Sequence, residues 1–442
     1  MVNLILLEME NRVYQGANYM FIGTRIRLLR KEKDLTLKEL SEGIMSVPYL
    51  SNIEAGKVEP NTEMLIRLAE RLHVPKEYLL NHSLASTETR EELEHLYRLA
   101  ANDFMKAREL IEEYSKDQFR YSNVYHEVLF KVIYCIYLYK IDEYEKATAL
   151  NDNFISQFIE EGQLEHLPFN GKLAFLYFWG ISNYYKKNLI SSLKYFEKLI
   201  EILPSTHDFR PNAYYNMAAI SYELRRYNES LKYARKSLQL HIENHSWIKI
   251  GELYNFIGII YWENGDLEDA NKYLDKSLEI AELKDIMHLK QRIVHNKGLL
   301  AKKEEKYFDA IQYFYSTIAL RKEANNPNLL SSYLGIIECY LLLDDIEKAI
   351  EIAKIAQKHI NSEADMYSYE LQYADILCKL GDKQTYIEKI ENVINYYEDN
   401  QNRQELVGLY RKAGDYYFQN RKYKDAAIHY HKELINQEEM NR

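Results

Sequence analysis

Residues 254–280, YNFIGIIYWENGDLEDANKYLDKSLEI, carry the clearest structural pattern in the sequence. It predicts a helix with small residues near its middle, a tight turn, and a second helix in which an apolar residue is followed three positions later by alanine. Similar stretches occupy residues 215–240, 295–320, 333–353 and 410–435. A chain built this way is predicted to stack its helix pairs on one another, because a single pair cannot bury its apolar face alone.

The small residue of the second helix gives the period of the repeat. It falls at Ala147, Ser192, Ser230, Ala270, Ala310, Ala349 and Ala426. The first five intervals after Ala147 are 45, 38, 40, 40 and 39 residues, and the last, of 77 residues, contains one degenerate unit around Leu380, Gly381 and Asp382. About 350 residues at this period allow roughly eight to nine helix pairs.

This unit resembles the tetratricopeptide repeat. The small, aromatic and turn positions of that repeat are occupied here by Gly258, Tyr261, Leu267, Ala270 and Leu274, and again by Gly414, Tyr417, Tyr423 and Ala426. The resemblance implies an all-α protein in which residues 91–442, here called the repeat domain, form a right-handed superhelix with a concave inner wall.

Residues 20–82, here called the head, follow a different pattern. Thr36 opens a capping box ahead of a short helix, and Gly43 stands where the end of that helix needs a left-handed residue. Ser46 is the predicted N-cap of the next helix, which tolerates Pro48 in its first turn. Two short helices joined in this way predict a helix-turn-helix.

The string LTLKELSEGIMSVPYLSNIEAGKVEPNTEMLIRLAERLHVPKEYLL, residues 35–80, resembles the Cro/repressor, or xenobiotic-response-element, type of helix-turn-helix. The resemblance implies a five-helix domain whose third helix enters the major groove of DNA. Leu50 and Ile53 must face the interior, which leaves the other side chains of that helix for bases and phosphates. The alternative is a domain of this fold that no longer binds DNA. The predicted DNA-binding residues are Arg25, Thr36, Lys38, Ser46, Val47, Tyr49, Asn52 and Lys57.

Charge is divided unevenly along the chain. The net charge is −10, yet the head holds ten Lys and Arg residues against nine Asp and Glu residues. The acidic excess therefore lies in residues 83–442. This division is typical of a protein whose near-neutral head contacts DNA and whose acidic body is repelled from it.

The remaining composition indicates a helical protein of the cytoplasm. Only 15 glycines and 7 prolines are present in 442 residues, so helix breakers are few. The 3 cysteines are far apart, which argues against a disulfide framework or a metal cluster, and no apolar stretch is long enough to span a membrane. Because the sequence contains no phosphate-binding loop, HExxH motif, CxxC motif or nucleophile elbow, we expect no enzyme activity, no cofactor and no metal site.

Asparagines recur near the middle of the first helix in three successive repeats, at Asn216, Asn255 and Asn296, and Asn183 lies toward the end of that helix one repeat earlier. Asparagine offers both a donor and an acceptor, so a row of them can clamp the backbone of an extended peptide. The alternative is that they form hydrogen bonds within the helix stack or face water. With tyrosines as apolar walls, the predicted peptide-binding residues are Asn183, Tyr215, Asn216, Tyr222, Tyr254, Asn255, Tyr261 and Asn296.

The combination of this head with a long repeat array resembles the RRNPP family of Gram-positive quorum-sensing receptors, the group that contains the Rap, NprR, PlcR and Rgg proteins. The stretch LSEGIMSVPYLSNIEAG, residues 40–56, is most similar to the NprR and PlcR branch. The resemblance implies a transcription regulator that binds a double-stranded DNA operator and is switched by a short, re-imported signalling peptide. The alternative is a repeat scaffold that sequesters a response-regulator protein, as Rap-like members do.

Because one head buries too little surface for useful specificity, we expect a homodimer on two half-sites. Residues 83–90 are expected to be a short linker that allows the repeat domain to position the head. Residues 1–19 show no period and are expected to be an N-terminal extension that is disordered or that precedes the native start at Met20.

Overall fold

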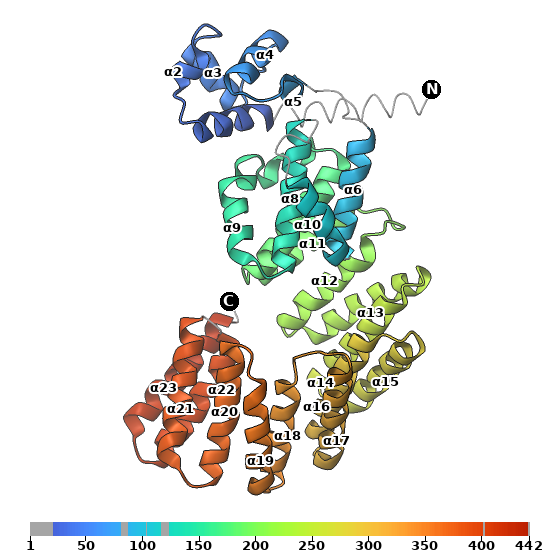
Figure 1. The fold of residues 1–442 in the computed structure, drawn as a ribbon, viewed down its shortest axis with the longest axis vertical. Coiled ribbons are helices and arrows are strands. Elements are labelled where there is room, and N and C mark those ends of the chain that lie inside the picture. Colours follow the sequence, from blue (N-terminus) through green and yellow to red (C-terminus); the bar gives the residue numbers. More distant parts are fainter. Residues whose placement is uncertain (1–20, 81–86, 103, 116–122, 401–402, 441–442) are drawn as a thin grey trace. The chain divides into compact units, whose positions relative to one another are not determined.

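The structure is a computed structural model that describes residues 21–80, 87–102, 104–115, 123–400 and 403–440. Every regular element within these ranges is a helix (Figure 1). By its internal contacts the chain divides into two compact units, residues 1–223 and residues 224–442. The extension expected at residues 1–19 lies outside the described residues.

The head has the predicted five helices. They are a helix over residues 21–32, α2 (Leu37–Ser41), α3 (Val47–Glu54), α4 (Thr62–Arg71) and α5 (Lys76–Leu80). Each contributes apolar side chains to one core that is closed to solvent. That core includes Ile22, Ile26, Leu29, Leu40, Leu50, Ile53, Leu65, Leu68 and Leu79, none more than 2% exposed.

The predicted caps define where α2 and α3 begin. The Thr36 hydroxyl accepts from the Glu39 backbone N–H at 3.2 Å, while the Glu39 carboxylate accepts from the Thr36 backbone N–H at 2.7 Å. The Ser46 hydroxyl accepts from the backbone N–H of Tyr49. Gly43, in the turn between the two helices, has φ 70°, which glycine adopts without the strain that a side chain would bring. The predicted caps are therefore confirmed.

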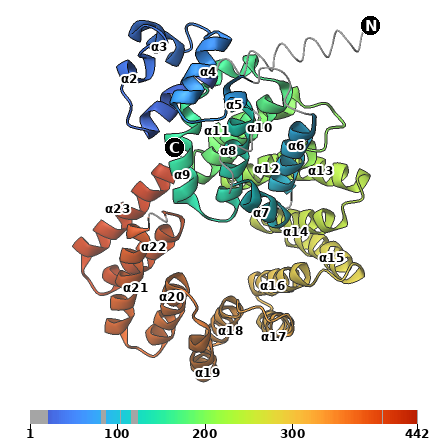
Figure 2. The ribbon, with the colours of Figure 1, turned by 45° about the horizontal axis from the view of Figure 1, so that its top comes forward.

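Beyond the head, the helices of each unit follow one another in chain order, as both views show (Figure 2). In the first unit they are α6 (Thr87–Asn102), α7 (Phe104–Tyr114), α8 (Val124–Lys140), α9 (Tyr144–Asn153), α10 (Phe169–Tyr185), α11 (Leu189–Ile202) and α12 (Arg210–Glu223). In the second unit they are α13 (Tyr227–Glu243), α14 (Trp247–Glu263), α15 (Leu267–Leu283), α16 (Met287–Lys303), α17 (Tyr307–Glu323), α18 (Leu330–Leu342), α19 (Ile346–Ala356), α20 (Glu363–Lys379), α21 (Lys383–Asp399), α22 (Arg403–Gln419) and α23 (Tyr423–Met440).

From α6 to α23, the described residues contain nine successive helix pairs. The predicted small residues all belong to the second helix of a pair and are at most 2% exposed, and in the pair α10 and α11 the two helices pack closely. Ser192 shows how close that packing is, because its hydroxyl donates to the carbonyl oxygen of Gly180 at 2.7 Å. A larger side chain would separate the two helices.

A left-handed residue forms the turn inside the pair, five positions before each of the seven small residues and at the same place in the degenerate unit. Its φ lies between 57° and 89° throughout. The residues are Asp142, Lys187, Arg225, Gly265, Glu305, Asp344, Gly381 and Arg421. Only two of them are glycine, so the packing of the helix pair, and not the turn residue itself, imposes this conformation.

The degenerate unit is the pair α20 and α21. Its turn residue, Gly381, has φ 85°, and five positions later Tyr386 stands where the other pairs have Ala or Ser. Tyr386 is nevertheless buried, at 7% exposure. On α20, Ala374 is fully buried and lies in the same apolar cluster as Tyr386.

Two short 3₁₀ helices account for the long interval of 45 residues between Ala147 and Ser192. They are η1 (Ile155–Gln157) and η2 (Glu161–His166), inserted between α9 and α10. At the domain boundary, α6 already begins at Thr87, so the described part of the expected linker 83–90 is helical from that residue.

Candidate DNA-binding and peptide-binding sites

The helix predicted to read DNA, α3, is held by its neighbours on one side only. Leu50 and Ile53 are buried in the head, as expected. Arg30, on the helix over residues 21–32, donates to both carboxylate oxygens of Glu54 at 2.7 and 2.8 Å. Gly23 on the same helix lies so close to α3 that a Cβ there would be 2.0 Å from the carbonyl oxygen of Ile53. The backbone of α3 is therefore fixed against the first helix.

Most of the predicted DNA-binding residues are exposed to solvent, on α3 and its ends or at the start of α2. Tyr49 is half-buried. Those exposed to solvent are Thr36, Lys38, Ser46, Val47, Asn52 and Lys57. Because polar, cationic and small side chains project from α3, from its two ends and from the start of α2, they can donate to phosphates and reach base edges.

Arg25 differs from the rest of the predicted set and requires a correction. Its side chain is 1% exposed, and its guanidinium pairs with the buried Glu127 of the repeat domain and with Glu32 of the head. The expectation that Arg25 contacts DNA rested on its charge alone, whereas in the structure that charge is buried. Sequence reasoning also missed Glu127, although a signal was present: it is the one acidic residue in the apolar helix α8.

The asparagines of the second unit bond to each other. The Asn296 side-chain amide donates to the Asn255 side-chain oxygen at 2.9 Å, and the two residues are 9% and 4% exposed. This bond, between first helices of neighbouring pairs, corresponds to the alternative of hydrogen bonding within the helix stack. One bond does not exhaust an asparagine, which has two donor hydrogens and an acceptor with two lone pairs.

The asparagines of the first unit are less deeply placed. Asn216 is half-buried, and its amide lies 3.4 Å from the hydroxyl of Tyr177. Asn183, also half-buried, donates to the carbonyl oxygen of Trp179 in its own helix at 2.8 Å. Of these two, Asn216 is better placed to exchange its bond for a ligand, because a bond of 3.4 Å is weak.

The predicted tyrosines differ in how far their side chains are exposed to solvent. Tyr215 is 38% exposed, Tyr222 and Tyr254 are half-buried, and Tyr261 is 8% exposed. In the second unit, Tyr261 stacks on the ring of Tyr273, and the ring of Tyr254 is tilted against the same ring with 6.0 Å between centroids. These two tyrosines therefore form part of one aromatic wall, which includes a ring that the sequence did not single out.

A buried lysine, Lys297, lies beside Asn255 and Asn296 and was not among the residues predicted from the sequence. Lys297 is 8% exposed, donates to Asn271 at 3.1 Å and pairs with Asp275. Burial lowers the pKa of the neighbouring His295 to about 4, so that imidazole is neutral at physiological pH. The charge beside Asn255 and Asn296 therefore comes from the lysine and its aspartate. Lysine is rarely buried, and its place next to Asn296 on α16 was the available signal.

Within the described ranges, no cluster of three or more His, Cys, Asp or Glu side chains has an arrangement suited to a metal ion. No helix in the same part of the chain is long and apolar enough to cross a membrane.

Comparisons with known proteins match both parts of the chain. The Helix-turn-helix family matches residues 26–79, and the Tetratricopeptide repeat family matches residues 209–282. The chain is 21% identical to the transcriptional activator NprA of Geobacillus stearothermophilus over 417 residues, which cover 88% of this chain and 97% of NprA. It is 25% identical to a tetratricopeptide-repeat protein of Methanocaldococcus jannaschii, over 62% of this chain and 46% of that protein.

Two solved structures share the fold. The apo form of the quorum sensor NprR from Bacillus thuringiensis superposes with a TM-score of 0.61 at 17% identity, covering 79% of this chain and 99% of NprR. A Rap protein complexed with Competence and Sporulation Factor superposes with a TM-score of 0.58 at 17% identity, covering 80% of this chain and 99% of its own. The head, the repeats and the similarity to NprA along nearly the whole chain confirm the resemblance to the RRNPP family of Gram-positive receptors.

Proposed function

We propose that this protein is a cytoplasmic transcription regulator that binds double-stranded DNA through α3 of its head and is controlled by a short linear peptide bound by its repeat domain. The observation that carries the proposal is the exposed face of α3, which presents Ser46, Val47 and Asn52 on a helix fixed from behind. The whole-length similarity to a protein named as a transcriptional activator supports it.

A mobility-shift assay tests the DNA-binding part of this proposal. DNA fragments selected by the full chain from a random pool should be shifted in preference to scrambled fragments at moderate salt. A chain that lacks residues 20–82 is the control and should shift neither. The proposal is wrong if the full chain shows no sequence preference, because electrostatic binding without base contacts does not specify an operator.

The peptide part rests on the asparagines and on the aromatic wall of the repeat domain. Extended peptides lose water from their backbone amides when they bind, so a protein that recognises them must supply donors and acceptors. The side chains of Asn216, Asn255 and Asn296 provide both. Mass spectrometry of small molecules that co-purify with the full chain tests this part without presupposing a peptide sequence.

The proposed assembly is a homodimer, because two heads on two half-sites supply the buried surface that specific recognition needs. Light scattering should give twice the mass of the chain, either free or with DNA. A strict monomer in both conditions would rule the dimer out.

A second function, sequestration of a response-regulator protein, is favoured by one observation. The chain superposes on a Rap protein over 99% of that protein's length. Affinity capture with residues 90–442 distinguishes the two functions. A stoichiometric protein partner bound without any peptide would favour the scaffold over the peptide-controlled regulator.

A further inference from the structure

The side of the head away from the exposed face of α3 rests on the first repeats of the same unit. Phe21 stacks on Tyr125 of α8, with 6.0 Å between ring centroids, and meets the edge of Phe158 at 5.5 Å. Phe158 and Phe154 flank η1, in the insertion that lengthens this repeat. The insertion therefore supplies part of the surface on which the head sits.

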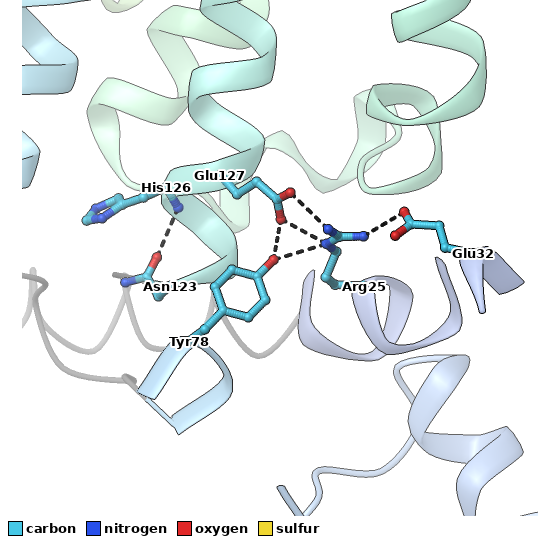
Figure 3. A network of polar contacts seen from close by, with 6 residues as sticks. All are labelled: Arg25, Glu32, Tyr78, Asn123, His126 and Glu127. Atoms are coloured by element: carbon cyan, nitrogen blue, oxygen red, sulfur yellow. Dashed lines mark hydrogen bonds and ion pairs between the residues drawn. The ribbon is translucent and has the colours of Figure 1, made fainter. Parts of the chain in front are cut away.

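A buried polar network lies at the centre of this contact (Figure 3). The Arg25 guanidinium donates to both carboxylate oxygens of Glu127, from Nε at 2.8 Å and from Nη2 at 3.0 Å. Its Nε also lies 3.0 Å from the hydroxyl of Tyr78, which donates to Glu127 in turn. The fourth member, Glu32, accepts from Nη1 of Arg25 at 3.0 Å at the solvent edge.

The network joins three separate pieces of the chain. Arg25 comes from the first helix of the head, Tyr78 from its last helix, α5, and Glu127 from the first turn of α8. All three are at most 2% exposed. Arg25 also lies over the ring of Phe154, 5.5 Å from its centroid. Burial, followed by the charge of Glu127, raises the pKa of Tyr78 well above its ordinary value, so the phenol remains a hydrogen-bond donor.

A carboxylate and a guanidinium buried together are stable only as a pair. If one partner is removed, the other remains as an uncompensated charge in an apolar contact, which is far costlier than losing an exposed ion pair. If the head moves away, both groups return to water. The network therefore favours two discrete arrangements, docked or released, over a loosely tethered head.

We propose that Glu127 is a positioning residue that fixes the DNA-reading head on the first repeats, with Arg25 and Tyr78 as its hydrogen-bonding partners on the head. The consequence for DNA recognition rests on the proposed function. Ser46, Val47 and Asn52 remain exposed in the docked arrangement, so the contact orients α3 and does not cover it. In a dimer, a fixed head sets the distance between the two reading helices.

The test measures the distance between the head and the repeats in the full chain. Spin labels are placed on cysteines introduced at Lys33 in the head and Lys146 on α9, both exposed. Cys378, which is exposed, is first replaced by Ser, while Cys135 and Cys339 are buried and remain unlabelled. The labelled chain that is otherwise unchanged should give one narrow distance distribution.

Glu127→Ala should broaden this distribution at least about twofold, because the head then samples released positions. Glu109→Ala, at an exposed glutamate on α7, is the matched control and should leave the distribution narrow. The triple variant Arg25→Met/Tyr78→Phe/Glu127→Leu should restore it, since buried polar partners can be replaced together by apolar groups of similar volume. An unchanged distribution in Glu127→Ala with an unchanged helical circular dichroism signal overturns the proposal.

If Glu127→Ala loses its helical signal, Glu127→Gln is measured instead, because it keeps the shape of the side chain and removes its charge. An unchanged distance distribution in that variant overturns the proposal.

A second experiment measures DNA affinity and does not depend on these distances. A fragment selected by the otherwise unchanged chain is lengthened by about five base pairs between half-sites, which is half a helical turn. The otherwise unchanged chain should bind the lengthened fragment at least about tenfold more weakly than the original one. Glu127→Ala should bind it less than about threefold more weakly, because its head is free to follow the displaced half-site. If the chain selects no DNA at all, the proposed function fails, while the distance measurement still decides whether Glu127 fixes the head.

Discussion

Asn52 is the residue on α3 whose chemistry is best suited to a base edge. It is exposed, and asparagine can donate to and accept from adenine in the major groove. We expect Asn52→Ala to weaken binding to the selected DNA by about 1–3 kcal/mol, or roughly 5- to 150-fold. Titration by fluorescence anisotropy measures this loss. Binding to scrambled DNA should change little, because phosphate contacts carry that affinity.

Ser51, exposed on the same helix but outside the predicted DNA-binding set, provides the control. Ser51→Ala should leave affinity within about twofold of the unchanged chain. Equal losses for Asn52→Ala and Ser51→Ala would mean that the helix does not read bases through Asn52.

The asparagines of the repeat domain should separate into two classes. Asn296→Ala leaves the buried oxygen of Asn255 without its donor, which should cost about 1–3 kcal/mol of folding stability whether or not a peptide binds. Asn216→Ala removes only a half-buried amide with a 3.4 Å contact and should leave the melting temperature nearly unchanged. If a peptide is clamped here, Asn216→Ala should still weaken its binding by about 5- to 150-fold.

Thermal melts beside titration calorimetry with the co-purifying peptide separate these effects. Unchanged peptide affinity in a stably folded Asn216→Ala variant would exclude this residue from the clamp. A large fall in melting temperature for Asn216→Ala would show instead that the residue is structural.

Among the helical elements, the turns inside the repeat pairs carry the clearest local strain. Glu305 is exposed and has φ 61°, a conformation that costs a non-glycine residue about 1 kcal/mol. Glu305→Gly should therefore raise the stability by roughly 0.5–1 kcal/mol, after the added freedom of the unfolded chain is subtracted. The corresponding rise in melting temperature is about 1–4 °C.

The reverse change at the equivalent position of the preceding pair is the matched control. Gly265 has φ 89°, and a Cβ there would meet nothing within 4 Å, so only backbone strain opposes a side chain. Gly265→Ala should lower the melting temperature by a similar amount. Equal melting temperatures for the two variants would contradict the claim that these turns are strained.

Features that depend on neighbouring residues were the ones that the sequence predicted well. The caps at Thr36 and Ser46 and the buried small residues such as Ala270 follow from spacings of three to five positions, and the structure confirms them. Tyr386 departs from the pattern, since a ring stands there in place of Ala or Ser and is still buried in the apolar cluster of its pair, which no spacing on α21 reveals.

Contacts between distant positions could not be predicted in the same way. Arg25 and Glu127 are 102 positions apart, and nothing on the helix over residues 21–32 distinguishes a surface arginine from one that is buried by another domain. The bond between Asn255 and Asn296 spans 41 positions, close to one repeat period. The repeat therefore predicted that the two side chains lie close together, but not that they form a hydrogen bond with each other.

Along the whole molecule, stability should be local, because within each unit a helix packs mainly on its neighbours in sequence. Phe314 of α17 illustrates such a junction. Its ring lies against Gly298 of α16 and Gly335 of α18, where added Cβ atoms would approach it to 2.8 and 2.6 Å. The ring therefore joins one pair to the next, and the two glycines are small because it occupies the space between them.

Gly335→Ala should destabilise this junction by about 1–3 kcal/mol through overpacking. Hydrogen exchange followed by mass spectrometry should then quicken in α16 to α19, while the helix over residues 21–32 keeps its protection. Gly408, where a Cβ would meet nothing within 4 Å, gives the control Gly408→Ala, which should quicken exchange at neither place. Uniformly faster exchange in Gly335→Ala would contradict local stability and mean that the repeats and the head open as one cooperative unit. Peptide binding to the repeats would then be able to reach the head through global stability alone, without any contact such as Glu127.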